Sequence, residues 1–337
     1  LRIVDAAGTA AWLHKLLPSV TSCSQFDEGE GPFVLAVAFT HAGLGKLAVP
    51  AGVQWPDPFL EGMGARADRL GDEGQSAPAQ WSGGLGKDEV DILVSIAGAD
   101  PASIEAGIHH VEDSLGDAIV RVGRDDAAHL PDKPAGTEHF GYVDGIGQPF
   151  VDGSGLKPWK GEGVPEKGGK WAAVQAGEFV LGYPLEKGSL PRSVHPFQKD
   201  GSYFALRKLA ENVASFREYL AASAKVSGLS EELLAAKMVG RWRSGAPLVL
   251  AKKSDDPKLA KDPSRNNDFH YNFLPLAEIF APPTPVDTSL MNPPMRVHLG
   301  LAQTILAGLG LVVGLIRWRD RERRATLIFL ALAAIVM

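Results

Sequence analysis

The sequence predicts an α+β protein in which two modules are followed by a helical tail typical of a membrane segment. Three observations predict this arrangement. Helical and strand patterns alternate over the first 122 residues, and a second set follows a Pro- and Gly-rich stretch near residue 132. An apolar run begins at residue 297. The chain has 337 residues, which is enough for two domains of ordinary size.

Five elements define the first module. Residues 6–17 have apolar side chains at helical spacing, and the pattern stops at Pro18. Residues 32–39 form a short apolar run typical of a buried strand, and residues 90–97 predict a second strand with clearer alternation. Pro101 begins a helix that extends to about residue 115, because proline suits a first helical turn. Residues 118–122 predict a third strand.

This order matches a βαββαβ ferredoxin-like unit that lacks only its first strand. Residues 1–4 are interpreted as a remnant of that strand, so we expect the chain to begin part-way into the fold. The segment 57–86 is too long for a hairpin turn and is expected to carry a helix around residues 59–70. Two prolines and a glycine in 129–137 predict the end of the first module, which we assign to residues 1–132.

The second module is assigned to residues 133–271. A Gly-, Lys- and Pro-rich segment over 149–175 is expected to be a long surface excursion. Strands are predicted over 178–183 and 202–206, and amphipathic helices over 210–223 and 231–239. These elements repeat too irregularly to predict their topology from the pattern alone.

Charge and cysteine content exclude some classes of function. The formal charge is −6, and residues 296–337 contribute +4, so the rest of the chain carries −10. An acidic body argues against nucleic-acid binding through a basic face. Cys23 is the only cysteine, which excludes an internal disulfide and a site built from several cysteines.

The sharpest local motif is EHFGYVDGIGQPF, at residues 138–150. Its glycines allow the backbone to come close to a flat ligand, because glycine has no side chain to collide. On composition alone an ordinary Asp-Gly turn is the better explanation of the motif.

The motif resembles the G-x-x-D-G signature of the dye-decolourising peroxidase family. Six further stretches resemble the same family in the same order, and together they cover roughly residues 1–271; they are PFVLAVAFTHAGLGKL, FLEGMGARADRLGD, GEFVLGYP, GSYFALRKL, AAKMVGRWRSGAPL and NNDFHY. The resemblance implies two ferredoxin-like modules, the second incomplete at its C-terminal part. It also implies haem b, hydrogen peroxide and aromatic reductants such as dyes or phenols, and it leaves assembly with further copies of the chain open.

The resemblance assigns roles to five residues. Asp144 matches the aspartate that moves a proton between the peroxide oxygens on the distal haem face. Gly145, Ile146 and Gly147 would lie against the porphyrin edge. Arg207 would approach a haem propionate, since a guanidinium suits carboxylates, or would form an ion pair on the surface or between the modules.

The sequence departs from the family where the iron ligand is expected. The family's G-x-H-I-R-R motif, which supplies the axial histidine, does not occur in this sequence, and the resemblance stops after Tyr271. His139 is near Asp144 in sequence, and His270 is nearest to the missing motif. We assign neither to the iron, so the metal ligand stays unknown and the active site is expected to be incomplete.

The sequence of the tail is typical of a membrane protein and differs from the rest of the chain. Residues 272–296 are a Pro-rich linker, and residues 297–316 have no ionised side chain apart from any charge on His298. Twenty helical residues span a bilayer core, and RWRDRERR then resembles a cytoplasmic basic loop. We expect two membrane helices within 297–337, the alternative being an amphipathic core helix. The junction near residue 272 is interpreted either as a natural fusion or as an accidental joining of unrelated sequences.

Three functions are compatible with these observations. The first is a haem peroxidase, in which Trp159, Trp171, Trp242 or Tyr203 relays electrons or simply packs. The second is an inactive, membrane-tethered haem-binding or scaffold remnant, and the third is a general binder of small flat molecules. The body is expected in the cytoplasm, and at a membrane if the tail is genuine.

Overall fold

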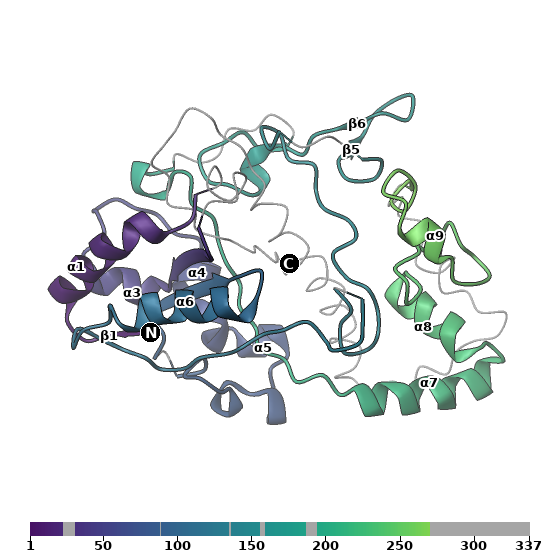
Figure 1. Cartoon of the computed structure of the whole chain (residues 1–337), viewed down its shortest axis with the longest axis horizontal. Helices are drawn as coiled ribbons and strands as arrows, with labels where there is room; N and C mark the ends of the chain where they lie inside the picture. Colours follow the sequence, from purple (N-terminus) through teal and green to yellow (C-terminus); the bar gives the residue numbers. More distant parts are fainter. Residues whose placement is uncertain (23–30, 88, 135, 156–158, 187–193, 270–337) are drawn as a thin grey trace.

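The computed structural model describes residues 1–22, 31–87, 89–134, 136–155, 159–186 and 194–269. The ribbon has two groups of elements, drawn in purple to blue and in green in Figure 1, with extended segments running between them. The predicted linker over 272–296 and the tail over 297–337 lie outside the described residues. Within the described residues, no helix is both long and apolar enough to cross a membrane.

The first group has the βαββαβ order that the sequence predicts. Its elements are β1 (Arg2–Ile3), α1 (Ala6–Leu16), β2 (Val34–Phe39), α3 (His41–Lys46), α4 (Asp57–Ala65), α5 (Ala67–Leu70), β3 (Ile92–Ala97), α6 (Pro101–Glu112) and β4 (Ile119–Val120). The remnant expected at residues 1–4 is strand β1, and the strands predicted over 32–39, 90–97 and 118–122 are confirmed with shorter bounds.

The four strands form two antiparallel pairs joined by backbone hydrogen bonds. β2 pairs with β3 from Val34 opposite Ala97 to Phe39 opposite Ile92, and β1 pairs with β4. Leu1 joins the two pairs, because Ile92 N donates to Leu1 O at 3.1 Å and Leu1 N donates to Ile92 O at 2.7 Å. β1 therefore lies between β4 and β3, the strand order expected of a ferredoxin-like unit.

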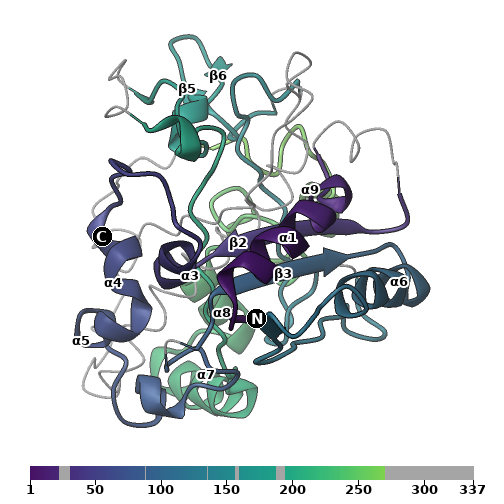
Figure 2. The ribbon, with the colours of Figure 1, turned by 90° about the vertical axis from the view of Figure 1, so that its left-hand side faces the viewer.

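One face of the β2–β3 pair carries the hydrophobic core. Alternate residues of each strand point to this face, as the sequence pattern predicts. The helices α1 and α6 lie alongside these strands (Figure 2). The buried residues of the core are Ile3, Trp12, Leu16, Val20, Leu35, Val37, Ile92, Val111 and Ile119. Full burial of one such side chain contributes about 1.5–3 kcal/mol, so this cluster is the main source of stability for the first module.

Local signals explain where the helices begin. Asp5 Oδ2 accepts Gly8 N at the start of α1, and Asp100 Oδ1 accepts Ser103 N at the start of α6. The helix predicted around residues 59–70 is instead two short helices, α4 and α5. Arg66, with a φ of −102° and a ψ of 12°, separates the two helices, and Gly62, with a φ of 74°, kinks α4 itself.

The second group is mainly helical. It contains α7 (Val213–Ser227), α8 (Glu231–Val239) and α9 (Pro257–Ala260), with a short antiparallel pair of β5 (Val164–Pro165) and β6 (Trp171–Ala172). Left-handed glycines end α7 and α8, at Gly228 and Gly240, and Ser230 caps the start of α8. The helix predicted over 231–239 has the same bounds in the structure, and the one predicted over 210–223 begins and ends a few residues later.

The strands predicted over 178–183 and 202–206 are wrong. Leu181 does exchange two backbone hydrogen bonds with residues 200 and 201, but no ladder continues from them. Gly182 has a φ of 93° and Asp200 a φ of 64°, and these left-handed conformations break an extended strand on both sides. The α+β class is confirmed. The expectation of a second ferredoxin-like sheet is not met within the described residues, where the β5–β6 pair is the only named sheet after β4.

The segment 198–208 runs along the first module. Gln198 Nε2 donates to Gln54 O at 2.8 Å, and the rings of Tyr203 and Phe59 are 5.3 Å apart. Lys208 forms an ion pair with Asp125. These contacts join residues that the boundary at 132 assigns to different modules, and that boundary itself stays a prediction.

Candidate functional site

The loop that begins at Thr137 is held closed by a carboxylate. Glu138 accepts two backbone hydrogen bonds, from Phe140 N and Tyr142 N, both at 2.6 Å. Its own N–H donates to Tyr142 O at 3.0 Å, and Gly141 provides the left-handed φ of 96° that the turn needs. Burial raises the pKa of Glu138, and the two backbone donors oppose that shift. The sequence analysis missed this role, although an acidic residue directly before a glycine-containing loop is a recognisable signal.

Asp144 follows this loop, and its position is fixed mainly by backbone contacts. Its N–H donates to Gly136 O at 2.7 Å, and its Oδ1 accepts Gly145 N at 2.6 Å. Burial raises the pKa of Asp144, and the bond from Gly145 partly lowers it. A carboxyl with a raised pKa holds a proton closer to neutral pH, which is the property that proton transfer requires.

The three residues after Asp144 differ in what they face. Gly145 has a φ of 72°, and no atom of the described residues lies within 4 Å of the place that a Cβ would occupy, so its outer side is open among them. Ile146 packs into the space left by Gly245, where a Cβ would lie 1.8 Å from Ile146 Cδ1. Gly147 lies against the side-chain amide of Asn267. The predicted residues 144–147 thus form one turn in which Gly145 is open, Ile146 packs against Gly245, and Gly147 is exposed but lies beside Asn267.

Arg243 supports the loop from the other side. Its Nη1 donates to Phe140 O at 2.9 Å, its Nε to Glu232 Oε2 at 2.8 Å, and its backbone carbonyl accepts Val143 N at 3.0 Å. Its guanidinium lies 5.1 Å from the centre of the Tyr142 ring. Tyr142 is buried, and burial raises its pKa to about 12. Its hydroxyl has no hydrogen-bond partner among the described residues.

Arg207 takes part in the ion pair that the sequence analysis gave as its alternative role. Its Nη1 donates to Asp72 Oδ2 at 3.0 Å, its Nη2 also contacts the Asp72 carboxylate, and its guanidinium lies 5.7 Å from the Trp81 ring. The Asp72 side chain is only 2% exposed. The structure therefore joins Arg207 to the first module and gives it no contact with residues 144–147.

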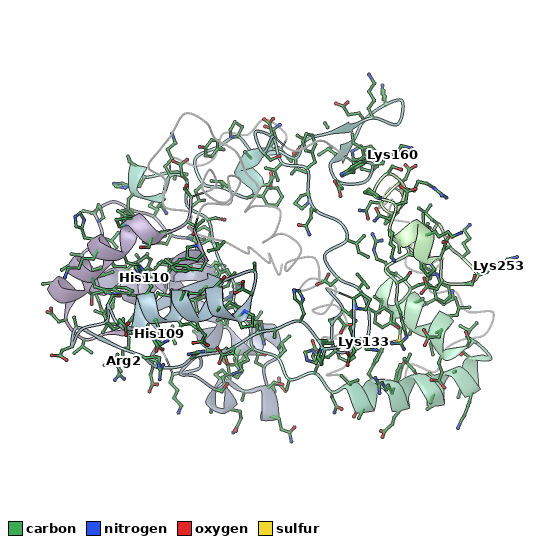
Figure 3. All side chains as sticks on the ribbon, in the orientation of Figure 1. Arg2, His109, His110, Lys133, Lys160 and Lys253 are labelled. Carbon is green, nitrogen blue, oxygen red and sulfur yellow. The ribbon has the colours of Figure 1, made fainter. Side chains whose placement is uncertain are left out.

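Histidine is the usual axial ligand of haem iron, and several histidines of this chain have other surroundings. His139 is 66% exposed and pairs with Glu211 Oε2 at 3.2 Å. His109 and His110 lie on α6 in the first group of elements (Figure 3). His270 lies outside the described residues. In the part of the chain that the structure describes, no three His, Cys, Asp or Glu side chains gather as a metal site.

The turn at Asp144 fits one face of a flat cofactor. A half-buried carboxyl stands beside an exposed glycine whose outer side meets no atom of the described residues. Gln148, at the end of the turn, has a buried Oε1 without a hydrogen-bond partner among the described residues. These features suit proton transfer and a close backbone approach by a flat ligand, but they do not include a ligand for iron.

The aromatic residues considered for electron transfer differ in burial and in contacts. Trp242 is buried, and its Nε1 donates to Ala251 O at 2.7 Å, so it packs as a core residue. Trp159 is 44% exposed. Tyr203 contacts Phe59, which in turn lies 5.0 Å from Trp55, measured between ring centres.

Comparison with protein-family models matches residues 2–131 to the DyP dimeric alpha+beta barrel domain. Among curated proteins, the chain is 34% identical to Peroxidase 2 of Mycetinis scorodonius, over 80% of this chain and 50% of that protein. It is 31% identical to a dye-decolorizing peroxidase of Mycena epipterygia, over 76% of this chain and 47% of that protein. The chain spans about half the length of the curated relatives it matches.

Solved structures give the same result for the fold. An ancestral D-type dye-decolorizing peroxidase matches with a TM-score of 0.68 and 30% identity, over 80% of this chain and 59% of that one. A dye-decolorizing peroxidase in complex with 2,6-dimethoxyphenol matches with a TM-score of 0.68 and 27% identity, over 81% and 61%. The described elements therefore have the arrangement of a large part of these structures.

Proposed function

Because the chain belongs to the dye-decolorizing peroxidase family over most of its length, we propose that it is a haem-dependent peroxidase, which reduces hydrogen peroxide and oxidises aromatic compounds. The observation that carries the proposal is the half-buried Asp144 carboxyl beside the open position of Gly145. A relative of known structure binds 2,6-dimethoxyphenol, which supports a phenolic reductant.

Asp144 is the proposed catalytic residue. Burial raises the pKa of its carboxyl, which favours the protonated form, and its backbone bonds to Gly136 and Gly145 hold it at a fixed point of the turn. We assign it the transfer of a proton between the two oxygens of bound peroxide, which assists cleavage of their bond.

Haem b is the proposed cofactor, and it supplies the redox chemistry of the reaction when bound. Gly145, Ile146 and Gly147 are the proposed contacts at its edge, since glycine backbone permits a close approach. We assign Arg207 to the ion pair with Asp72 rather than to a propionate, because both its terminal nitrogens already contact that carboxylate. The iron ligand stays unassigned.

The test compares two aspartate variants of the full chain. Asp144→Asn keeps the shape of the side chain and removes the proton carrier, and Asp132→Asn changes an exposed aspartate whose φ of 58° asparagine also adopts. After titration with haem, a Soret band reports binding, and peroxide-dependent oxidation of 2,6-dimethoxyphenol reports turnover. We expect a loss of about 10²-fold or more for Asp144→Asn, typical of a missing general acid–base group, and none for Asp132→Asn.

Three outcomes would overturn parts of this proposal. Equal turnover in wild type and Asp144→Asn would remove Asp144 from the mechanism. A Soret band in the wild type without turnover would instead favour the alternative, an inactive haem-binding remnant, while neither band nor turnover would favour a binder of other flat molecules. Assembly with a second copy also stays a proposal, which sedimentation of the full chain tests.

A further inference from the structure

Two neighbouring asparagines are buried beside the Asp144 turn, but they make different contacts. Asn266 and Asn267 are each 5% exposed. Asn266 Nδ2 donates to Ala260 O at 3.1 Å, which ties it to the end of α9. The Asn267 amide instead lies against Gly147, where a Cβ would be 3.2 Å from its Nδ2 and 3.4 Å from its Oδ1. Only Asn267 therefore contacts the turn.

Arg241 connects Asn267 to the second surface on which the turn rests. Its Nη2 donates to Asn267 Oδ1. Its Nη1 donates to Gly245 O at 2.8 Å and to Asn266 O at 3.2 Å. Gly245 provides the space that Ile146 fills. One guanidinium thus holds the residues that pack against both Ile146 and Gly147.

Asn267 also contains a buried donor, Nδ2, without a hydrogen-bond partner in the described part of the chain. A buried donor without a partner costs stability, and such groups in proteins often serve function. A gain in stability therefore explains this amide poorly, and its contact with Gly147 explains it better.

We propose that Asn267, oriented by Arg241, is a positioning residue that holds the Gly145–Gly147 backbone and thereby fixes the Asp144 carboxyl. Its meaning for catalysis rests on the proposed function of Asp144. The contact itself involves only residues of this chain and can be tested without cofactor.

Amide hydrogen exchange of the full chain without added haem tests the contact. Asn267→Leu keeps the branched shape and removes the oxygen that Arg241 binds, Asn267→Asp keeps that oxygen, and Asn266→Leu is the control with equal burial. In peptides covering residues 142–150, we expect exchange at least tenfold faster in Asn267→Leu and near-normal exchange in Asn267→Asp. Asn266→Leu should change these peptides less than twofold and affect those of α9 instead.

Arg241→Lys keeps the charge and loses the two-nitrogen contact, so it should also accelerate exchange over 142–150. The Arg241→Lys variant tests the positioning role even if Asn267→Leu fails to fold. Equal acceleration in the two leucine variants, or unchanged exchange in Asn267→Leu and Arg241→Lys, would overturn the positioning role.

Turnover separates this proposal from the proposed function. In an active wild type, Asn267→Leu should lower kcat about tenfold while KM for 2,6-dimethoxyphenol stays constant, and Asn266→Leu should leave both near normal. An inactive wild type would contradict the proposed function, while the exchange result would still decide whether Asn267 holds the turn.

Discussion

At the scale of single residues, the loop around Asp144 contains polar groups that burial makes unfavourable. The Tyr142 hydroxyl is buried without a partner among the described residues, and the pKa values of Glu138 and Asp144 are raised by burial. A fold selected for stability alone would replace such groups with apolar ones of similar shape. Their presence is consistent with the proposed function, in which this loop gives up some stability for chemistry.

Removal of the Tyr142 hydroxyl should therefore not destabilise the protein. We expect Tyr142→Phe to leave the free energy of unfolding unchanged or to raise it by about 1 kcal/mol, because a buried hydroxyl without a partner is lost. The matched change is Tyr183→Phe, which removes a hydroxyl that donates to Asp200 Oδ1 at 2.6 Å and should cost about 1 kcal/mol. Urea unfolding measures both. A larger loss in Tyr142→Phe than in Tyr183→Phe would contradict the interpretation.

The raised pKa of Asp144 also predicts how stability depends on pH. A carboxyl whose pKa is raised in the folded state favours folding most below its ordinary pKa, and this contribution is lost as pH rises through the folded value. Asp144→Asn should therefore raise the urea midpoint at pH 7 and have little effect at pH 3. An equal effect at both pH values would show that the change acts through something other than ionisation.

At the scale of elements, the helices begin and end where the sequence provides caps. Ser230 Oγ accepts Leu233 N at 3.2 Å at the start of α8. Ser230→Ala should lower the free energy of unfolding by about 1 kcal/mol, the usual effect of a lost N-cap. Ser223→Ala, inside α7, is the control and should be neutral or slightly stabilising, since alanine has the higher helix propensity. Thermal unfolding of the two variants checks the difference, and equal destabilisation would contradict it.

These caps also explain which elements could be predicted. The bounds of α8 follow from Ser230 and Gly240, which are local signals. The strands expected near Glu178 and Ser202 failed because an apolar run does not reveal the positive φ of Asp200, and glycine at 182 is compatible with either conformation. The sequence therefore predicted the first module well and the second mainly through its helices.

The candidate site was predictable only within one turn. Residues 144–147 are adjacent in sequence, so a single motif brings them together. Arg241 and Asn267 reach that turn from about a hundred residues away, and the pairing of Arg207 with Asp72 spans 135 residues. Charge and spacing do not specify such partners, because many arginines and carboxylates are available at similar separations.

At the scale of the whole molecule, the pair of Arg207 and Asp72 ties the extended segment before α7 to the first group of elements. Arg207→Ala would leave a buried carboxylate without its cation, which typically costs about 3–5 kcal/mol. Lys160→Ala removes an exposed pair with Asp268 and should cost at most about 1 kcal/mol (Figure 3 labels Lys160). Urea unfolding followed by tryptophan fluorescence measures both losses, and similar small losses would contradict that role.

The place of β1 between β4 and β3 also has a consequence for protein synthesis. β1 leaves the ribosome before either of its neighbours exists, since it pairs with residues 119–120 and its preceding residue bonds to Ile92. The apolar side chains of β1 and α1 must therefore stay unpaired while about a hundred further residues are translated. During that interval the nascent chain exposes an apolar, aggregation-prone segment of the kind that ribosome-associated chaperones bind.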